Sequence, residues 1–248
     1  MTTSRLDIGF AHFSSCSGCQ LMLLNCETEL PGLENMIRCI DFDMIDSRAD
    51  RKGPFDLVLV EGSISLPREL DRLLELRQRA HRLVAVGACA TTGGVNRFEV
   101  PPRLSAAKIV YDDEADDLAI FPPQPLHKFV VVDASIVGCP PERKDFLDLF
   151  GALLHGGWPV MREVPVCMEC RIRENRCLLE QDGLACFGPV TRSGCEARCP
   201  SINVPCEGCR GEVAEANRDE LCRLLLDTGL SGQELKSRAQ RFAGGESD

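Results

Sequence analysis

The sequence has few aromatic residues and no long uninterrupted apolar run. Aromatic side chains make up 5% of the 248 residues, with one tryptophan and one tyrosine. No apolar stretch approaches the roughly 20 residues that span a bilayer. The first ten residues, MTTSRLDIGF, contain neither a charged segment followed by an apolar one nor a twin-arginine pair. We therefore expect no direct membrane insertion, no export and a cytoplasmic location.

An excess of basic residues is also missing. The chain has 28 Lys and Arg against 38 Asp and Glu, which gives a formal net charge of −10 at pH 7. Binding nucleic acid requires a basic face that neutralises phosphates, so the composition argues against a nucleic-acid partner. The acidic run YDDEADD at 111–117 is expected to be solvated, with a docking patch as the alternative.

Cysteine, in contrast, is abundant. The chain has 15 cysteines, and an odd number excludes complete internal disulfide pairing. Reducing conditions disfavour structural disulfides, so a cysteine-dense pattern in a cytoplasmic protein more often indicates metal binding. We therefore expect most of these thiols to be metal ligands.

The first part of the chain alternates between short β-branched or apolar segments and helix-like segments. The expected strands are 6–13, 37–44, 55–64, 83–88 and 128–135. The expected helices are 19–30, 66–82 and 140–156, and no regular structure is assigned to 95–127. This βαβα order predicts an α/β fold with a doubly wound parallel sheet.

The composition changes near Trp158. The next fifty residues or so hold eight cysteines and little periodic apolar signal. We expect a small cysteine-rich domain held together by metal rather than by a hydrophobic core, followed by one or two helices. The predicted domains are residues 1–157 and residues 158–248.

Four cysteines of the first domain share one topological property. Cys16 and Cys19 follow the first expected strand, Cys89 follows the fourth, and Cys139 follows the fifth. The carboxyl ends of parallel strands border the crevice where such sheets bind ligands. A C-x2-C pair with two single cysteines matches the ligand number of a 4Fe-4S cluster. A lone cysteine in such a loop is more often an ordinary buried residue, so the prediction depends on all four together.

The second domain contains enough cysteines for two four-thiolate sites. They are Cys167, Cys170, Cys177, Cys186, Cys195, Cys199, Cys206 and Cys209. A C-x3-C-P step followed by a C-x2-C pair favours iron-sulfur ligation. Zinc ribbons also use paired C-x2-C units, so a zinc-stabilised module without electron transfer is the alternative. Cys26, Cys39 and Cys222 lack clustered partners and are expected to be ordinary residues.

The motifs occur in a recognisable order. They are C-S-G-C at 16–19, V-E-G-S-I at 60–64, G-A-C-A-T-T-G-G at 87–94, V-G-C-P-P at 137–141 and C-x8-C-F-G-P-V-T-R-S-G-C at 177–195. Together they resemble the small subunit of [NiFe] hydrogenases over residues 5–211. The resemblance implies a flavodoxin-like domain that binds the proximal cluster, a cysteine-rich domain that binds two clusters, and a large subunit that holds the nickel-iron centre.

The resemblance also implies how the twelve cysteines divide among three 4Fe-4S clusters. The proximal cluster would take Cys16, Cys19, Cys89 and Cys139. The distal cluster would take Cys167, Cys170, Cys177 and Cys186, with Cys167 where the family commonly has histidine. The medial cluster would take Cys195, Cys199, Cys206 and Cys209. Some relatives have a proline in the medial set and carry a 3Fe-4S cluster, and Cys199 here implies a full 4Fe-4S cluster.

All-cysteine ligation and the absence of an export signal resemble the cytoplasmic, cofactor-coupled branch of the family. Within it, the motifs look most like small subunits of soluble NAD(P)-linked hydrogenases, also called sulfhydrogenases. The chain would then relay electrons to an NAD(P)- or ferredoxin-linked partner, such as a diaphorase-type flavin subunit or an iron-sulfur subunit. Relatives linked to a deazaflavin subunit or to heterodisulfide reductase share much of the pattern and are the alternative.

Two further predictions concern a related family and an acidic residue. The small iron-sulfur subunit of respiratory complex I typically has adjacent cysteines at its first motif, whereas this chain has C-S-G-C and an eight-cysteine tail. That assignment is therefore disfavoured.

Glu61 ends the third expected strand, so it either lies near the proximal site or is a plain surface or capping carboxylate.

Overall fold

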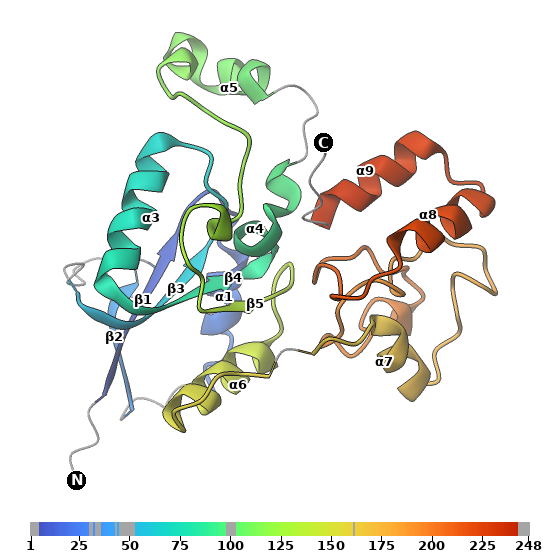
Figure 1. Ribbon diagram of the computed structural model, residues 1–248, viewed down its shortest axis with the longest axis horizontal. Coiled ribbons are helices and arrows are strands. Elements are labelled where there is room, and N and C mark those ends of the chain that lie inside the picture. The colour runs from blue at the N-terminus through green and yellow to red at the C-terminus, as the bar shows by residue number, and fades with distance from the viewer. Residues whose placement is uncertain are drawn as a thin grey trace. The chain divides into compact units, whose positions relative to one another are not determined.

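The computed structural model describes residues 5–29, 32, 36–42, 44, 53–97, 103–160 and 162–242. The chain divides into two compact units, Met1–Gly157 and Trp158–Asp248 (Figure 1). We describe each unit by itself.

The first unit is built on a five-stranded parallel sheet. Its strands are β1 (Leu6–His12), β2 (Ile37–Phe42), β3 (Phe55–Glu61), β4 (Ala80–Val86) and β5 (Ala134–Ile136). They lie in the order β2-β1-β3-β4-β5, and all neighbouring pairs are parallel. This is the flavodoxin-like order, in which the chain reverses direction across the sheet between β1 and β3. The predicted α/β fold is confirmed.

Helices cover both faces of this sheet (Figure 1). The helices of the first unit are α1 (Gly18–Leu24), α3 (Pro67–Arg79), α4 (Gly87–Thr92), α5 (Arg103–Tyr111) and α6 (Arg143–Leu154), with 3-10 turns at Gly94–Arg97, Asp112–Asp116 and Leu126–Lys128. Leu57 and Leu59 of β3 join the core with α1 and α6, whereas Val58 and Val60 join the core with α3. This alternation buries both faces of β3, as its continuous apolar run predicts.

The fifth strand is shorter and later than predicted. The sequence pattern placed it at 128–135, but only Ala134–Ile136 pair with β4. Leu126–Lys128 instead form a 3-10 turn, and Arg77 donates to the carbonyl of Val131 at 3.2 Å. Residues 130–132, the valines before Asp133, therefore form no strand pairing with β4, and Val131 is 75% exposed.

The segment without predicted structure contains a helix. α5 and the following 3-10 turn at Asp112–Asp116 pack on one another, with Ala107 and Ala115 buried. The hydrophobic pattern did not predict this helix, because its apolar residues do not form one buried face: Ile109, Val110 and Tyr111 are exposed. This part of the prediction was wrong.

The second unit has a small hydrophobic core as well as its cysteines. Its helices are α7 (Val166–Ile172), α8 (Arg218–Asp227) and α9 (Gly232–Phe242), with a 3-10 turn at Pro200–Ile202. Leu221 and Leu225 of α8 and Leu235 of α9 pack with Phe187 and Val190. The expectation that a hydrophobic core is missing was therefore wrong, because the C-terminal helices supply apolar faces to the cysteine-rich loops.

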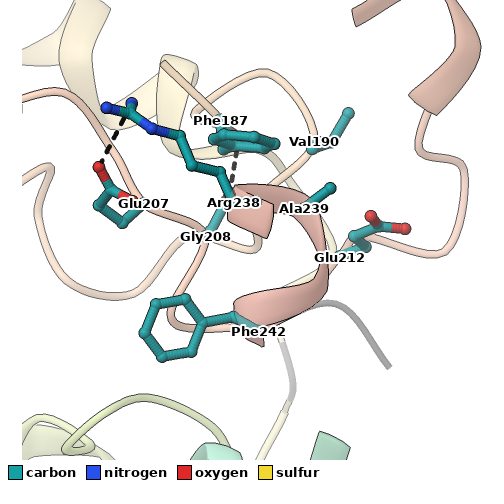
Figure 2. A pocket seen from close by; sticks show the side chains of 9 residues that line it. Phe187, Val190, Glu207, Gly208, Glu212, Arg238, Ala239 and Phe242 are labelled. Atoms are coloured by element: carbon teal, nitrogen blue, oxygen red, sulfur yellow. Dashed lines mark hydrogen bonds and ion pairs between the residues drawn. The ribbon is translucent and has the colours of Figure 1, made fainter. Parts of the chain in front are cut away.

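Helix α9 also covers a loop that carries two of the predicted ligands. Glu207 lies between Cys206 and Cys209 and forms an ion pair with Arg238 at 3.7 Å (Figure 2). It forms a second ion pair with Arg241 at 3.2 Å. Phe187, Gly208 and α9 line a cavity of about 20 Å³ here, which has room for about one water molecule. The ion pairs and the apolar contacts therefore fix α9 against the loop of the last C-x2-C pair.

Asp133 anchors the short edge strand that precedes Cys139. Its carboxylate accepts from the Leu83 amide at 2.7 Å and from Arg77 at 2.6 Å. Burial opposes the charged form, but the hydrogen bonds from Leu83 and Arg77 outweigh it and lower the pKa of Asp133 from its ordinary value of 3.8. Because the pKa of Asp133 is lower in the folded state than in the unfolded state, its carboxylate stabilises the fold at pH values above the unfolded-state pKa. This contribution is lost as the pH falls through the folded-state pKa.

We predict that Asp133→Ala lowers the free energy of unfolding of the chain by about 1 kcal/mol at pH 7. The difference from the unchanged chain should shrink below about pH 4, where the carboxylate becomes protonated. Denaturant unfolding at several pH values measures this effect. Asp148→Ala removes an exposed ion pair with Lys144 and should cost less than about 0.5 kcal/mol. An effect of Asp133→Ala that is independent of pH would contradict the assignment.

Candidate functional site

The four predicted ligands of the first unit lie at the carboxyl ends of three parallel strands. Cys16 follows β1, and Cys19 lies in the first turn of α1. Cys89 lies in α4, which begins directly after β4, and Cys139 follows β5. Cys89 is thus in a short helix rather than in the loop that its glycines suggested.

The structure brings these four thiols close enough for one to affect the pKa of another. Burial and the carboxylate of Glu61 raise the pKa of Cys19, and the thiols of Cys89 and Cys139 raise it further. Burial raises the pKa of Cys89 to about 12, with added contributions from Cys139 and Cys16. Burial and Cys16 also raise the pKa of Cys139. Ionisation of one of these thiols thus opposes ionisation of Cys19, Cys89 or Cys139, and a cationic metal cluster relieves this repulsion.

Small residues let the thiols lie against the backbone. Gly87 has a φ of +82°, and a Cβ atom there would lie 2.4 Å from Sγ of Cys19. The adjacent Ala88 amide donates to the Gly138 carbonyl at 2.7 Å, which ties the start of α4 to the loop of Cys139. The position of the Cys19 side chain therefore requires a glycine at residue 87.

Glu61 is buried beside the four cysteines of the first site and does not lie at the surface. Its side chain is 1% exposed. One carboxylate oxygen accepts from Ser15 Oγ at 2.9 Å and from Gln20 Nε2 at 3.0 Å, and the other accepts from the Gln20 amide at 3.1 Å. Glu61 therefore fixes the segment between Cys16 and Cys19 to the end of β3. Ser15 and Gln20, which the motif analysis did not single out, are its partners.

In the second unit, four cysteines form a group around α7. Cys167 and Cys170 lie on this helix. Burial raises the pKa of Cys167 to about 11, and Cys186, Cys170 and Cys177 contribute to the shift. A Cβ atom at Gly188 would lie 3.5 Å from Sγ of both Cys167 and Cys186. The absence of a side chain at Gly188 thus leaves space beside two predicted ligands.

Of the other four predicted ligands in the second unit, Cys195 and Cys206 adjoin this group. Burial raises the pKa of Cys206, and the thiols of Cys186 and Cys209 raise it further. The Cys206 amide donates to Sγ of Cys186 at 3.3 Å. Cys195 lies close enough to Cys170 to raise its pKa. Cys199 is exposed and immediately precedes the 3-10 turn at Pro200–Ile202. The predicted distal and medial sets therefore meet at two points.

Two buried charged residues that sequence reasoning missed flank Cys195. Burial raises the pKa of the Cys195 thiol, the carboxylate of Glu169 raises it further, and the guanidinium of Arg210 opposes this shift. Glu169 is 8% exposed and Arg210 is 6% exposed. Their sequence signal is a charged residue inside C-M-E-C and another directly after C-E-G-C, each next to a predicted ligand.

The donor chemistry of these groups fits iron-sulfur clusters. Thiolates favour zinc and iron-sulfur centres. In the part of the chain that the structure describes, no group of three or more His, Cys, Asp or Glu side chains is arranged to hold one metal ion. A 4Fe-4S cluster is a larger body that binds each cysteine through a different iron, so its ligands do not converge on a single point.

The other three cysteines lie apart from these groups. Cys26 is fully buried after α1, with Sγ 3.7 Å from the carbonyl of Met22. Cys39 lies in β2, and Cys222 lies in α8. Their positions agree with the expectation that they are ordinary residues.

The comparisons with known proteins identify the family. Residues 16–153 match the family described as NADH ubiquinone oxidoreductase, 20 Kd subunit. The sulfhydrogenase 2 subunit delta of Pyrococcus furiosus is 32% identical over 238 residues, which cover 96% of this chain and 99% of that protein. A vhu subunit of the F420-non-reducing hydrogenase of Methanocaldococcus jannaschii is 31% identical over 276 residues, covering 98% and 91%. The chain belongs to the hydrogenase small-subunit family.

Solved structures of [NiFe] hydrogenases share the fold. A chain of the NAD+-reducing [NiFe]-hydrogenase in the H2-reduced state aligns with a TM-score of 0.57 and 24% identity, covering 63% of this chain and 95% of that chain. A chain of the actinobacterial-type NiFe-hydrogenase from Ralstonia eutropha H16 aligns with a TM-score of 0.62 and 16% identity, covering 83% and 78%. These structures show the fold, and the more similar relatives, which are hydrogenase subunits, confirm the predicted membership of the hydrogenase small-subunit family, a family of oxidoreductase subunits.

The relatives also decide between the two related families. The matched family description names the 20 kDa complex I subunit, but the match ends at residue 153, before the eight-cysteine segment. The hydrogenase subunits instead align over nearly the whole chain. Among the described residues of the small subunit, none of the helices has the length and apolar character needed to cross a bilayer.

We predict that Gly87→Ala destabilises the small subunit more than a glycine-to-alanine substitution at an open position does. A Cβ atom at the positive φ of Gly87 would collide with Sγ of Cys19, so the free energy of unfolding of the metal-free chain should fall by about 1–3 kcal/mol. Denaturant unfolding measures the change.

The control is Gly151→Ala in α6, where a Cβ atom meets nothing within 4 Å. Because alanine favours a helix more than glycine does, this variant should be as stable as the unchanged chain or more stable by up to about 1 kcal/mol. Equal effects of the two substitutions would contradict the packing of Gly87 against Cys19.

Proposed function

We propose that this chain is the electron-transfer subunit of a soluble [NiFe] hydrogenase and that it holds three 4Fe-4S clusters. One observation carries the proposal: the cysteines of the first unit follow β1, β4 and β5 at one edge of the parallel sheet, where the Ala88 amide ties the helix of Cys89 to the loop of Cys139 at 2.7 Å. The edge of a parallel sheet where strands end is where such folds bind ligands. The two cysteine groups of the second unit would supply the remaining ligands.

The proposed ligand sets follow the two units. Cys16, Cys19, Cys89 and Cys139 would hold the proximal cluster, Cys167, Cys170, Cys177 and Cys186 the distal cluster, and Cys195, Cys199, Cys206 and Cys209 the medial cluster. When bound, the clusters supply one-electron carriers, and the protein sets their positions and electrostatics.

The protein's own contribution is ligation, burial and hydrogen bonding to sulfur. Cys186 and Cys206 are buried, and the Cys206 amide already points at Sγ of Cys186. Amide donors near a cluster sulfur and exclusion of water are among the factors that set a reduction potential. Glu61 keeps the first C-x2-C segment at the end of β3 and so fixes the proximal ligands to the most buried strand.

The proposed partners are a large subunit that holds the nickel-iron centre and a diaphorase-type flavin or iron-sulfur subunit that receives the electrons. The likeness to a subunit named sulfhydrogenase supports an NAD(P)- or ferredoxin-linked acceptor. The alternative is a deazaflavin- or heterodisulfide-reductase-linked enzyme; the likeness to a gamma subunit of a coenzyme F420 hydrogenase supports the deazaflavin-linked form. The subunits that copurify with the chain distinguish the two.

Anaerobic purification of the assembled enzyme tests the proposal. We expect a brown preparation with absorption at about 400 nm, at least about twelve iron atoms per small subunit, and paramagnetic signals that appear on reduction. A colourless complex with zinc in place of iron would overturn the proposal and favour the zinc-stabilised module.

Cys89→Ser tests the proximal ligand set. Because Cys89 lies among Cys16, Cys19 and Cys139, its loss should remove about four iron atoms per small subunit and leave the two C-terminal clusters in place. Hydrogen-dependent dye reduction by the assembled enzyme should fall at least about tenfold, since one relay site is lost.

Cys39→Ser in β2 is the matched control, because it removes a thiol from the same sheet away from the strand ends. It should retain full iron content and activity. Unchanged iron content and dye reduction in Cys89→Ser would show that the proximal assignment is wrong.

A further inference from the structure

Glu169 is a buried carboxylate that the predicted ligand sets do not account for. It lies in α7, between Cys167 and Cys170 in the motif C-M-E-C, and its residue exposure is 8%. Carboxylates are seldom buried unless they are paired or hydrogen-bonded, because burial removes the water that solvates their charge. The partners of Glu169 therefore indicate its role.

These partners belong to the loop that carries Cys195. One carboxylate oxygen accepts from the Gly194 amide at 2.9 Å, and the other accepts from the Ala197 amide at 3.1 Å. The second oxygen is also 3.9 Å from Sγ of Cys195. The carboxylate thus spans the loop on both sides of Cys195 while its own backbone lies in the helix of Cys167 and Cys170.

Cationic groups around this carboxylate differ in their exposure. Arg162 approaches one of its oxygens at 3.8 Å, but its side chain is 55% exposed. Arg210 is buried and donates from Nε to the Ser193 carbonyl at 2.9 Å, next to the Gly194 amide that Glu169 binds. The loop of Cys195 is therefore held by a buried carboxylate at Gly194 and Ala197 and by a buried guanidinium at Ser193.

We infer that Glu169 is a positioning residue that joins the two cysteine groups of the second unit and places a buried negative charge between them. It holds Cys195 against the helix of Cys167 and Cys170. A negative charge in a water-poor site disfavours the addition of an electron nearby, so Glu169 lowers the reduction potential of the adjacent clusters. This inference rests on the proposed function, because it requires clusters at these cysteines.

Glu196 provides a matched control one residue from Cys195. It carries the same charge, but its side chain is 68% exposed and pairs with Arg173. Water and salt screen an exposed charge much more strongly than a buried one. Removal of the Glu196 charge should therefore leave the cluster potentials close to those of the unchanged enzyme.

The first experiment is a redox titration of the assembled enzyme, followed by electron paramagnetic resonance, for the unchanged protein, Glu169→Gln and Glu196→Gln. We expect Glu169→Gln to raise the potential of at least one C-terminal cluster and Glu196→Gln to shift none. Equal potentials in all three proteins would overturn the inference. An unchanged protein without clusters would instead overturn the proposed function, so the two failures are distinguishable.

Glu169→Asp tests the positioning role by a separate measurement. Aspartate keeps the charge but is one methylene shorter, so it cannot reach both the Gly194 and Ala197 amides from the same backbone position. We expect iron release to a chelator from the assembled enzyme to become several-fold faster than in Glu196→Gln, while the potentials stay near those of the unchanged enzyme. If Glu169→Asp released iron at the same rate as Glu196→Gln, the positioning role would be overturned. This comparison does not depend on whether Glu169→Gln assembles.

Discussion

Parallel pairing of β1, β3, β4 and β5 is the constraint on which the first site depends. Because these strands run in one direction, the segments that follow them emerge at one edge of the sheet, and Cys16, Cys19, Cys89 and Cys139 all belong to such segments. No two of the three sequence segments are close in the chain. The thiols meet only because hydrogen bonding of the strands holds the segments in register.

The same constraint explains why the site lies on a rigid base. β3 is buried on both faces by the two halves of the core, and its last residue, Glu61, reaches the C-x2-C segment through Ser15 and Gln20. Ser14 and Ser63 exchange backbone hydrogen bonds of 3.2 and 3.0 Å next to this carboxylate. The loops around the cysteines are therefore fixed by the most buried part of the sheet, which suits ligands that must keep their spacing.

The second unit reaches a comparable result without a sheet. Its loops are held by buried polar groups and by a small apolar core supplied from α8 and α9. Glu169 and Arg210 replace strand pairing as the groups that hold the loop of Cys195, and α9 holds the loop of Cys206 and Cys209 through Glu207. Buried charges in this role bring an electrostatic effect that an apolar contact would not have.

The α/β class, the family and the twelve candidate cysteines could be predicted from the sequence, because strand periodicity, C-x2-C spacing and motif order are local or ordered along the chain. The prediction placed β5 too early and missed α5, since the pairing of Ala134–Ile136 with β4 and the packing of α5 on the following 3-10 turn are not encoded in hydrophobic periodicity. The burial of Glu61 beside Cys19, the need for a glycine at position 87 and the contacts of Glu169 with the loop of Cys195 became visible only in the folded structure. These facts depend on which segments meet in space, and the packing of the folded chain sets that.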